Sequence, residues 1–478
     1  MDTASFQFVC FGLCVALISN FSRRRAWRSA VLMLASLLFL GLLAHQPALF
    51  VPLAGFLLLG FAGLKAIERG WSKRIVWPVC AVILAYIWLK KYAFLPGTGF
   101  LHFPYFTLGL SYIFFRVLHL QIDAGDTREK NPVGLGAYLL YTLNFTTFVS
   151  GPIQRYGDFA RDQFAAEPIS LGWGMIGLQI ERIIRGFFKV NVAAALLLAL
   201  HEDAFVQLTH GGPLELKLNA AFRLSVIYPI YLYCNFSGYI DVVIALARLM
   251  RLRLPENFDR PFSATSFIDF WSRWHITLSN WLKTYVYNPL LLALMRRFDS
   301  IKLQPFLGVV CFFVTFFLIG VWHGRTPEFI FFGVLQGSGV ALNKMWQLAL
   351  TRAIGRQKYK SLGANFFYSS FARGLTFSWF ALTLYWFWGS WGEIGQLYHA
   401  IAHGLWLAVW TAIWLAATVV LASWEWLRAM LLMPKIASGP LLLTRYARVV
   451  YATALGFVSL VMTLLLNQPA PDIVYKAF

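Results

Sequence analysis

The chain has 478 residues, of which 59% are hydrophobic and 13% are charged, and it carries a formal net charge of +20. This composition is too apolar for a set of ordinary soluble domains, which we therefore exclude. The basic residues lie in short clusters between apolar runs, as in 23–25 and 296–297, which is typical of membrane-protein loops and argues against nucleic-acid binding. The sequence predicts an all-α, polytopic integral membrane protein.

Apolar stretches long enough to cross a bilayer recur along the chain, and we expect about 11 to 13 helices, several of them short, re-entrant or interfacial. The first stretch is followed directly by Arg23–Arg25, so the positive-inside rule places the N-terminus outside. No repeat or linker is visible, and we expect one integral domain over 1–478. Polar and ionisable groups within apolar sequence gather in about 105–345, where we expect the chemistry.

Two segments of this region combine charges with helical periodicity. Glu181, Arg185 and Lys189 follow one another at four-residue spacing, which predicts an amphipathic helix with internal ion pairing. Asp241 lies inside a later apolar run and shares a helix face with Arg248, seven residues on. Asp241 either pairs with Arg248 or orients a histidine, and we favour the ion pair.

The segment 271–285 has helical rather than strand periodicity, and we expect one continuous helix. Trp271, Trp274 and His275 would share an aromatic, apolar face of this helix, with Thr277 on the other face. The segment is too polar for a lipid-facing span and suits a re-entrant or interfacial helix buried against protein.

The next apolar run, from Leu303 to Trp322, is long enough to be a span and ends in His323, within Gly-Val-Trp-His-Gly. A titratable group at such a position is costly and usually functional. A neutral imidazole accepts protons near neutral pH, and burial favours the neutral form. We expect Gly320 and Gly324 to leave room for a substrate to approach the ring. His323 is therefore the candidate general base.

The sequence gives little reason to expect a bound metal. His399 and His403 have the spacing of a zinc pair but lack an adjacent glutamate and a clear third ligand. The five cysteines lie in apolar sequence, and none pairs with a histidine at ligand spacing. We expect neither a metal site nor a bound cofactor.

Several motifs, found in consistent order between about 105 and 345, together resemble the bacterial membrane-bound O-acyltransferase family. A short loop after an apolar span, Ser150-Gly-Pro-Ile-Gln-Arg-Tyr156, is similar to a loop of that family. The four motifs that form the specific combination are Phe236-Ser-Gly-Tyr-Ile-Asp241, Pro255-Glu-Asn-Phe258, Phe270-Trp-Ser-Arg-Trp-His275 and Gly320-Val-Trp-His-Gly324.

The resemblance implies a multi-helix membrane enzyme with a central tunnel. Members of the family include enzymes that acetylate alginate and enzymes that transfer D-alanyl groups during teichoic acid modification. It implies that His323 is the catalytic histidine and His275 a second active-site histidine. The substrate-binding or supporting residues predicted from the same motifs are Trp322, Trp274, Asp241 and Asn257.

The chain departs from the alginate-acetylating type after Tyr287-Asn-Pro-Leu290, where it continues as an apolar helix. This looks more like the D-alanyl type, in which the corresponding helix docks an acyl carrier protein. Met295, Arg296 and Arg297 are therefore the candidate docking residues for an acidic carrier. Ordinary positive-inside topology is the alternative explanation for the two arginines.

We expect an O-acyltransferase of the cytoplasmic membrane that moves a small acyl group, D-alanyl or acetyl. The donor is a cytoplasmic thioester, on a phosphopantetheine carrier protein or coenzyme A, and serves as co-substrate. The acceptor is a hydroxyl of an extracytoplasmic envelope polymer or of a relay protein. A second hypothesis is a transporter or flippase in which buried His275, His323 and Asp241 form a relay.

Overall fold

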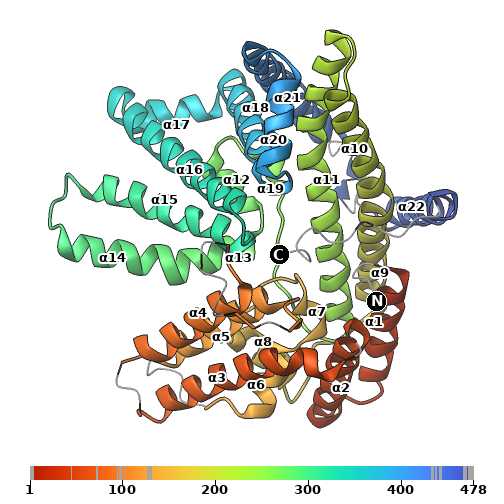
Figure 1. Cartoon of the computed structure of the whole chain (residues 1–478). Helices are drawn as coiled ribbons and strands as arrows, with labels where there is room; N and C mark the ends of the chain where they lie inside the picture. Colours follow the sequence, from red (N-terminus) through yellow and green to blue (C-terminus); the bar gives the residue numbers. More distant parts are fainter. Residues whose placement is uncertain are drawn as a thin grey trace. The chain divides into compact units, whose positions relative to one another are not determined.

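The computed structural model describes residues 5–44, 46–71, 74–93, 95, 100–101, 103–125, 132–431, 435–436, 439–440, 444–466 and 471. Helices dominate these residues (Figure 1). In the described residues, the strands are β1 (Lys435–Ile436) and β2 (Gly439–Pro440), a two-residue antiparallel pair in which Lys435 faces Pro440. The predicted all-α class is confirmed.

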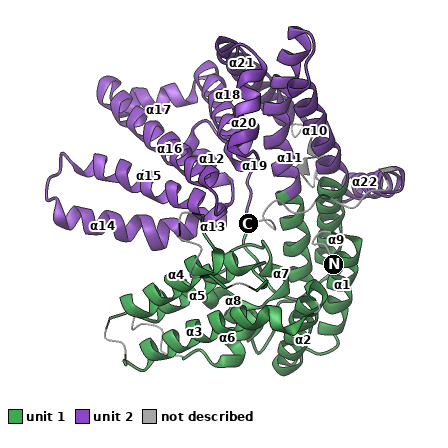
Figure 2. Ribbon diagram, viewed as in Figure 1, with its two compact units in different colours: residues 1–191, 236–256, 466–478 green, residues 192–235, 257–465 purple. Residues whose placement is uncertain are grey.

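The chain divides into two compact units, which Figure 2 colours separately. Unit 1 comprises residues 1–191, 236–256 and 466–478. Its helices are α1 (Phe6–Ser19), α2 (Arg25–Leu43), η1 (Pro47–Phe50), α3 (Val51–Glu68), α4 (Val76–Lys90), α5 (Leu110–Ala124), α6 (Leu135–Thr142), α7 (Phe145–Phe148), α8 (Tyr156–Gln163) and α9 (Trp173–Phe188).

Unit 2 comprises residues 192–235 and 257–465. Its helices are α10 (Ala195–Thr209), η4 (Pro261–Ser263), α12 (Phe267–Arg273), α13 (Ile276–Leu282), η5 (Lys283–Tyr287), α14 (Asn288–Arg297), α15 (Gln304–His323), α16 (Pro327–Ile354), α17 (Arg356–Ala364), α18 (Phe366–Thr383), α19 (Tyr385–Trp388), α20 (Trp391–Ala400), α21 (His403–Leu431) and α22 (Arg445–Leu466, whose last residue falls in unit 1). The π-helical η3 (Lys189–Ala194) and the long α11 (Leu214–Leu249) contribute residues to both units. The prediction of one integral domain stays a prediction.

Seven helical segments among the described residues are long and apolar enough to cross a membrane. They are α2, η1 with α3, α9 through α10, α11, α15, α21 and α22, and the apolar α1 and α4 are shorter. The predicted polytopic membrane protein is confirmed, whereas the total of about 11 to 13 helices around a tunnel stays a prediction.

Within unit 1, the carboxylate of Asp241 on α11 is surrounded by cations from α9 and η3. It accepts hydrogen bonds from Arg182 Nε and Lys189 Nζ, each at 2.9 Å. Arg185 Nε lies 3.5 Å from the second carboxylate oxygen. The side chain of Asp241 is only 10% exposed, so this cluster is a largely buried charge network that ties two helices together.

The predicted ion pair between Asp241 and Arg248 is wrong. Seven residues along a helix correspond to a rise of about 10.5 Å, which a short aspartate side chain does not bridge easily. Cations on a neighbouring helix reach the carboxylate instead. The predicted amphipathic helix is present as α9, where Arg185 lies 3.9 Å from Glu181 while also approaching Asp241.

Replacing Asp241 by asparagine should destabilise the protein by about 3 kcal/mol, because it leaves several partly buried cations without their anion. Thermal unfolding of the purified protein in detergent measures this change. The control is Asp158→Asn, whose carboxylate pairs with Arg161 at 3.0 Å on an exposed surface, where an ion pair contributes roughly 0–1 kcal/mol. Equal unfolding temperatures for the two variants would contradict a structural role for Asp241.

Within unit 2, α15 and α16 pack side by side through glycines (Figure 1). A Cβ atom on Gly320 would overlap the backbone of Gly333 and lie 2.6 Å from the carbonyl oxygen of Phe329. A Cβ on Gly333 would lie 2.5 Å from the carbonyl oxygen of Phe317. Small residues that let backbones approach are characteristic of helix pairs in membranes, and this pair positions the end of α15.

Candidate active site

His323 is the last residue of α15, and its side chain is 2% exposed. The helix starts with Pro305 in its first turn and ends where Gly324 takes an extended conformation. The His323 ring lies 5.2 Å from the ring of Phe387 on α19 and 6.0 Å from that of Phe332 on α16, measured between centroids. The imidazole is therefore held in an aromatic enclosure at the helix end.

The glycines that flank this histidine have a role that differs from the expected one. We expected Gly320 and Gly324 to leave space for substrate. Gly320 instead admits the backbone of α16, and a Cβ on Gly324 would overlap the ring of Phe329. Both glycines allow protein groups to pack closely and so fix the position of the His323 ring.

His275 lies at a break between two short helices, so the predicted continuous helix 271–285 is wrong. Its backbone is left-handed, with φ 45° and ψ 51°, between α12 and α13. The cause is a strand-like contact with 257–259: Ile276 N donates to Asn257 O at 3.0 Å, and Asp259 N donates to Arg273 O at 2.9 Å. This pairing replaces helical hydrogen bonds and turns His275 out of the helix.

Asn257 determines which nitrogen of His275 carries the proton. Its Oδ1 accepts from the backbone N of Thr277 at 3.1 Å and from the Thr277 hydroxyl at 2.8 Å. Because a backbone N–H can only donate, the Asn257 atom that faces Thr277 N must be the oxygen Oδ1. His275 Nδ1 lies 3.3 Å from the same oxygen and must therefore donate to it as well. In the neutral ring, Nε2 then carries the lone pair.

His275 is fully buried and lies outside the seven candidate spans. Burial lowers the pKa of His275 to about 3, because the charged imidazolium loses its hydration. The ring is therefore neutral near pH 7. A neutral imidazole with a defined lone pair can accept a hydrogen bond or a proton from a substrate hydroxyl.

The indole of Trp322 lies next to both histidines. Its ring centroid is 4.8 Å from that of His323 and 6.2 Å from that of His275, with the latter pair in an edge-on arrangement. His275, Trp322, His323 and Asn257 thus lie together within unit 2, and the roles that the motifs predict for them stay predictions. The site combines two buried imidazoles with an aromatic wall.

Trp274 belongs to the aromatic core beside this site. Its ring stacks on Phe270 at 5.6 Å and meets Phe258 edge-on at 5.1 Å. Phe380 of α18 lies 5.1 Å away. These contacts fix the segment on either side of the break at His275, which indicates a supporting role for Trp274.

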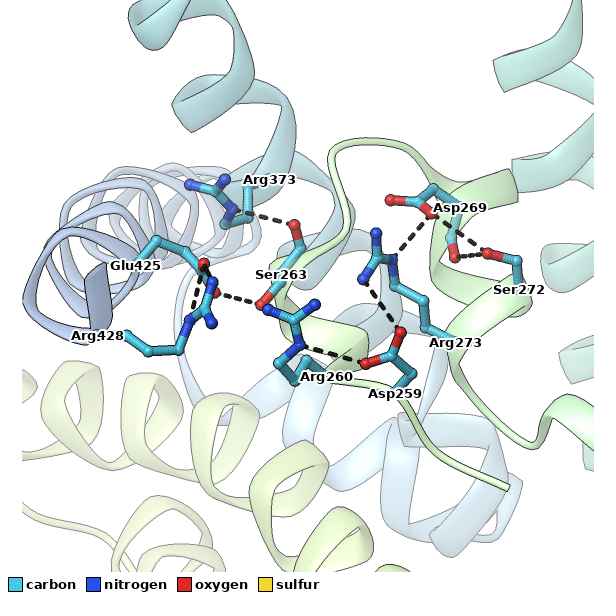
Figure 3. Close-up of polar contacts among 9 residues, drawn as sticks. All are labelled: Asp259, Arg260, Ser263, Asp269, Ser272, Arg273, Arg373, Glu425 and Arg428. Carbon is cyan, nitrogen blue, oxygen red and sulfur yellow. Dashed lines mark hydrogen bonds and ion pairs between the residues drawn. The ribbon is translucent and has the colours of Figure 1, made fainter. Parts of the chain in front are cut away.

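A polar network fastens the segment between Asn257 and His275 to α18 and α21 (Figure 3). The Ser263 hydroxyl donates to Glu425 of α21, and Arg373 of α18 donates to the Ser263 carbonyl at 3.3 Å. Arg273 links Asp269, at 2.9 Å, with Asp259, at 3.8 Å. These contacts hold the segment between Asn257 and His275 in place, and so support the hydrogen bond from His275 Nδ1 to Asn257 Oδ1.

Replacing Asn257 by leucine should lower acyl transfer by about 10- to 100-fold and destabilise the protein by about 2 kcal/mol. Three buried donors around His275 and Thr277 would lose their acceptor, and the His275 ring would lose its fixed tautomer. Turnover and unfolding temperature measure the two effects. Asn280→Leu, at an exposed position on α13, is the matched control. Full activity in the Asn257 variant would contradict the role assigned to this amide.

Other predicted residues lie elsewhere in the chain. Asp241 belongs to unit 1, where cations surround it. Met295, Arg296 and Arg297 form the last turn of α14, with both arginines exposed. Sequence reasoning missed Thr277, which it placed on the far face of an unbroken helix.

It also missed Phe387, because this residue lies beyond the predicted core of about 105–345. The only available signal for it was its place in Tyr385-Trp-Phe-Trp388, a run of aromatic residues after an apolar helix. Such a run is also typical of a membrane interface, so it did not point to the histidines.

Comparison with protein families gives one match that covers most of the chain. A family model described as "MBOAT, membrane-bound O-acyltransferase family" matches residues 56–387. The match includes His275, His323 and Phe387, and it extends beyond both ends of the core predicted from the motifs.

Relatives of three kinds are among the curated proteins that the chain matches. A teichoic acid D-alanyltransferase of Streptococcus thermophilus is 30% identical over 283 residues, which are 59% of this chain and 66% of the relative. A probable alginate O-acetylase of Pseudomonas putida is 32% identical over 52% of this chain and 46% of the relative. A peptidoglycan O-acetyltransferase of Helicobacter pylori is 29% identical over 44% of this chain and 38% of the relative. The chain thus matches about two thirds or less of each of these relatives.

Proposed function

Because this chain belongs to the membrane-bound O-acyltransferase family, we propose that it transfers a small acyl group, D-alanyl or acetyl, to a hydroxyl of a cell-envelope polymer or of a relay protein. The pairing of buried His275 and His323 around Trp322 is the observation that carries this proposal. The protein would act in the cytoplasmic membrane, with its acceptor on the extracytoplasmic side.

The reaction requires proton transfer to and from a buried base. The acceptor hydroxyl attacks the thioester carbonyl while His323 takes the hydroxyl proton. The carbon–sulfur bond then breaks, and the leaving thiolate receives the proton from the imidazolium of His323. His275, neutral and with its lone pair on Nε2, would accept a hydrogen bond from a substrate and orient it for this attack.

The donor would be a thioester on a phosphopantetheine carrier protein or on coenzyme A. The end of α14 supports a carrier, because it combines two exposed arginines with exposed apolar side chains. Leu292 is 56% exposed and Phe298 is 46% exposed, next to Arg296 and Arg297. On this surface, the arginines would attract acidic groups of a carrier protein at the rim of the interface, and the apolar side chains would contact it at the centre.

Reversing both charges with Arg296→Glu and Arg297→Glu should raise the KM for an acyl group on a carrier protein by about tenfold or more, since like charges would then repel an acidic partner. The KM for a small soluble thioester should not change. Steady-state kinetics with the two donors measures the difference. Lys358→Glu with Lys360→Glu, two exposed positions on α17, controls for net charge. Equal KM values for the carrier donor in both double variants would place the docking surface elsewhere.

The proposed activity is tested with the full chain reconstituted in lipid vesicles. Isotopically labelled D-alanyl-carrier and acetyl-coenzyme A serve as donors, and teichoic acid, alginate and peptidoglycan fragments serve as acceptors. We expect one combination to give a base-labile labelled ester, identified by mass spectrometry. Release of free acid without ester in every combination would contradict transfer to these acceptors.

A further inference from the structure

A cavity of about 240 Å³ lies within unit 2, apart from the histidine site. Its walls come from α11, α18, α19, α20 and the candidate span α21. The described lining residues are aliphatic, aromatic or hydroxyl-bearing, and none of them carries a full charge at neutral pH. An apolar cavity of about 150 Å³ already holds a benzene ring, so this one has room for part of a larger apolar molecule.

The cavity wall contains hydrogen-bond donors that have no acceptor in the part of the chain that the structure describes. Of three lining tryptophans, Trp406 donates its indole N–H to the carbonyl oxygen of Tyr398 at 3.3 Å. The indole nitrogens of Trp386 and Trp410 are buried, and neither has an acceptor among the described residues. Buried donors are nearly always paired in folded proteins, so these two N–H groups are available to bind an acceptor on a molecule that enters the cavity.

A hydroxyl pair at the same wall has a defined direction. Ser225 donates its only hydroxyl proton to the carbonyl oxygen of Ala221 at 2.7 Å. Tyr385, whose oxygen lies 2.7 Å from Ser225 Oγ, must therefore donate to Ser225. The hydroxyl proton of Tyr385 is thus already donated within the protein and is not available to a ligand. The indoles of Trp386 and Trp410 are the buried donors left for one.

We propose that this cavity binds the ester-bearing part of a membrane glycerolipid acyl chain. The apolar walls suit the hydrocarbon, and the indole N–H groups suit the ester carbonyl, which accepts hydrogen bonds without carrying a charge. The lack of charged lining side chains disfavours a phosphate headgroup. Tyr398 at the wall is 49% exposed, and α21 is a candidate span, so the lipid would come from the surrounding bilayer.

The bound chain would also brace a helix that contacts the histidine site. Tyr385 and Trp386 line the cavity, and Phe387 of the same short helix packs against His323 at 5.2 Å. Lipid binding itself does not depend on the proposed acyl transfer. It is measured on the protein without any donor or acceptor.

The experiment uses the full chain in vesicles that contain one of two photoreactive glycerolipids, matched in chain length. Both lipids carry a diazirine near the start of one hydrocarbon chain. In one lipid an ester joins this chain to the glycerol, and in the other lipid an ether does. Crosslinked peptides are identified by mass spectrometry. We expect the ester lipid to label peptides of α18 to α21 about tenfold more than the ether lipid, which lacks the carbonyl.

Removing the two indole N–H groups with Trp386→Phe and Trp410→Phe should lower the labelling of these peptides by the ester lipid about tenfold, to the level seen with the ether lipid. Trp424→Phe, at a position 55% exposed on the same helix α21, should change nothing. Ile413→Trp fills the cavity and should abolish labelling by either lipid, provided that gel filtration and thermal unfolding show a folded protein.

Three results would overturn the proposal. Equal labelling by the ester and ether lipids would show that the cavity binds a hydrocarbon chain but does not recognise the ester carbonyl. Labelling unaffected by the tryptophan pair and by the filled cavity would place the lipid elsewhere on the surface. No labelling of α18 to α21 by either lipid would mean that no lipid chain enters the cavity and that water satisfies the two indoles.

Discussion

Replacing His323 by alanine should reduce acyl transfer by a factor of about 10² to 10⁴, the usual contribution of a general base. The side chain is buried in an aromatic enclosure at the end of α15, where water is poorly placed to replace it as the base. The loss should appear in turnover more than in KM, since the base acts during attack on the thioester rather than in binding. Labelled-ester formation in vesicles measures both quantities.

Two comparisons separate this role from others. His399→Ala, at an exposed histidine on α20, controls for the loss of an imidazole. In cells, the His323 variant should lack the acyl ester on its product polymer, while export of the unmodified polymer continues. If export stopped as well, the transporter hypothesis would gain and the role of His323 as a base would fail.

Much of this fold follows from local sequence. The run from Leu303 to Trp322 predicts α15 almost to the residue, because an uninterrupted apolar stretch in lipid must satisfy its backbone as a helix. The same run places His323 at its end, so the candidate base was identifiable from the cost of a titratable group there. The four-motif order predicts His275 as a second active-site histidine, and the structure places it beside the same indole.

The details of the site depend on contacts between distant segments, which periodicity does not report. His275 sits at a break because the backbone carbonyl of Asn257 accepts from Ile276 N, and the Asn257 side chain binds His275 itself, 18 positions along the chain. Trp274 and Thr277 therefore have surroundings that a continuous helix would not give them. The partners of Asp241 likewise come from α9 and η3, separate elements whose packing against α11 the local pattern does not specify.

The second large effect is expected from a single methyl group at Gly320. Gly320→Ala should destabilise the protein by about 1–3 kcal/mol or more, because the added Cβ overlaps the backbone of Gly333, which cannot rotate away as a side chain could. The two helices would have to separate, and His323, one turn from Gly320, would shift with α15. A displacement of about 1 Å at a catalytic group is enough to lower activity by about 100-fold.

The chain offers a matched control in Gly41→Ala, within the candidate span α2, where nothing lies within 4 Å of the added methyl group. Alanine forms helices better than glycine, so this variant should be neutral or slightly stabilised. Thermal unfolding and ester formation are measured on both variants. If Gly320→Ala kept full activity and stability, close packing of α15 on α16 would not be what positions His323. Activity lost at an unchanged unfolding temperature would instead indicate that Gly320 leaves space for substrate, as its sequence context first suggested.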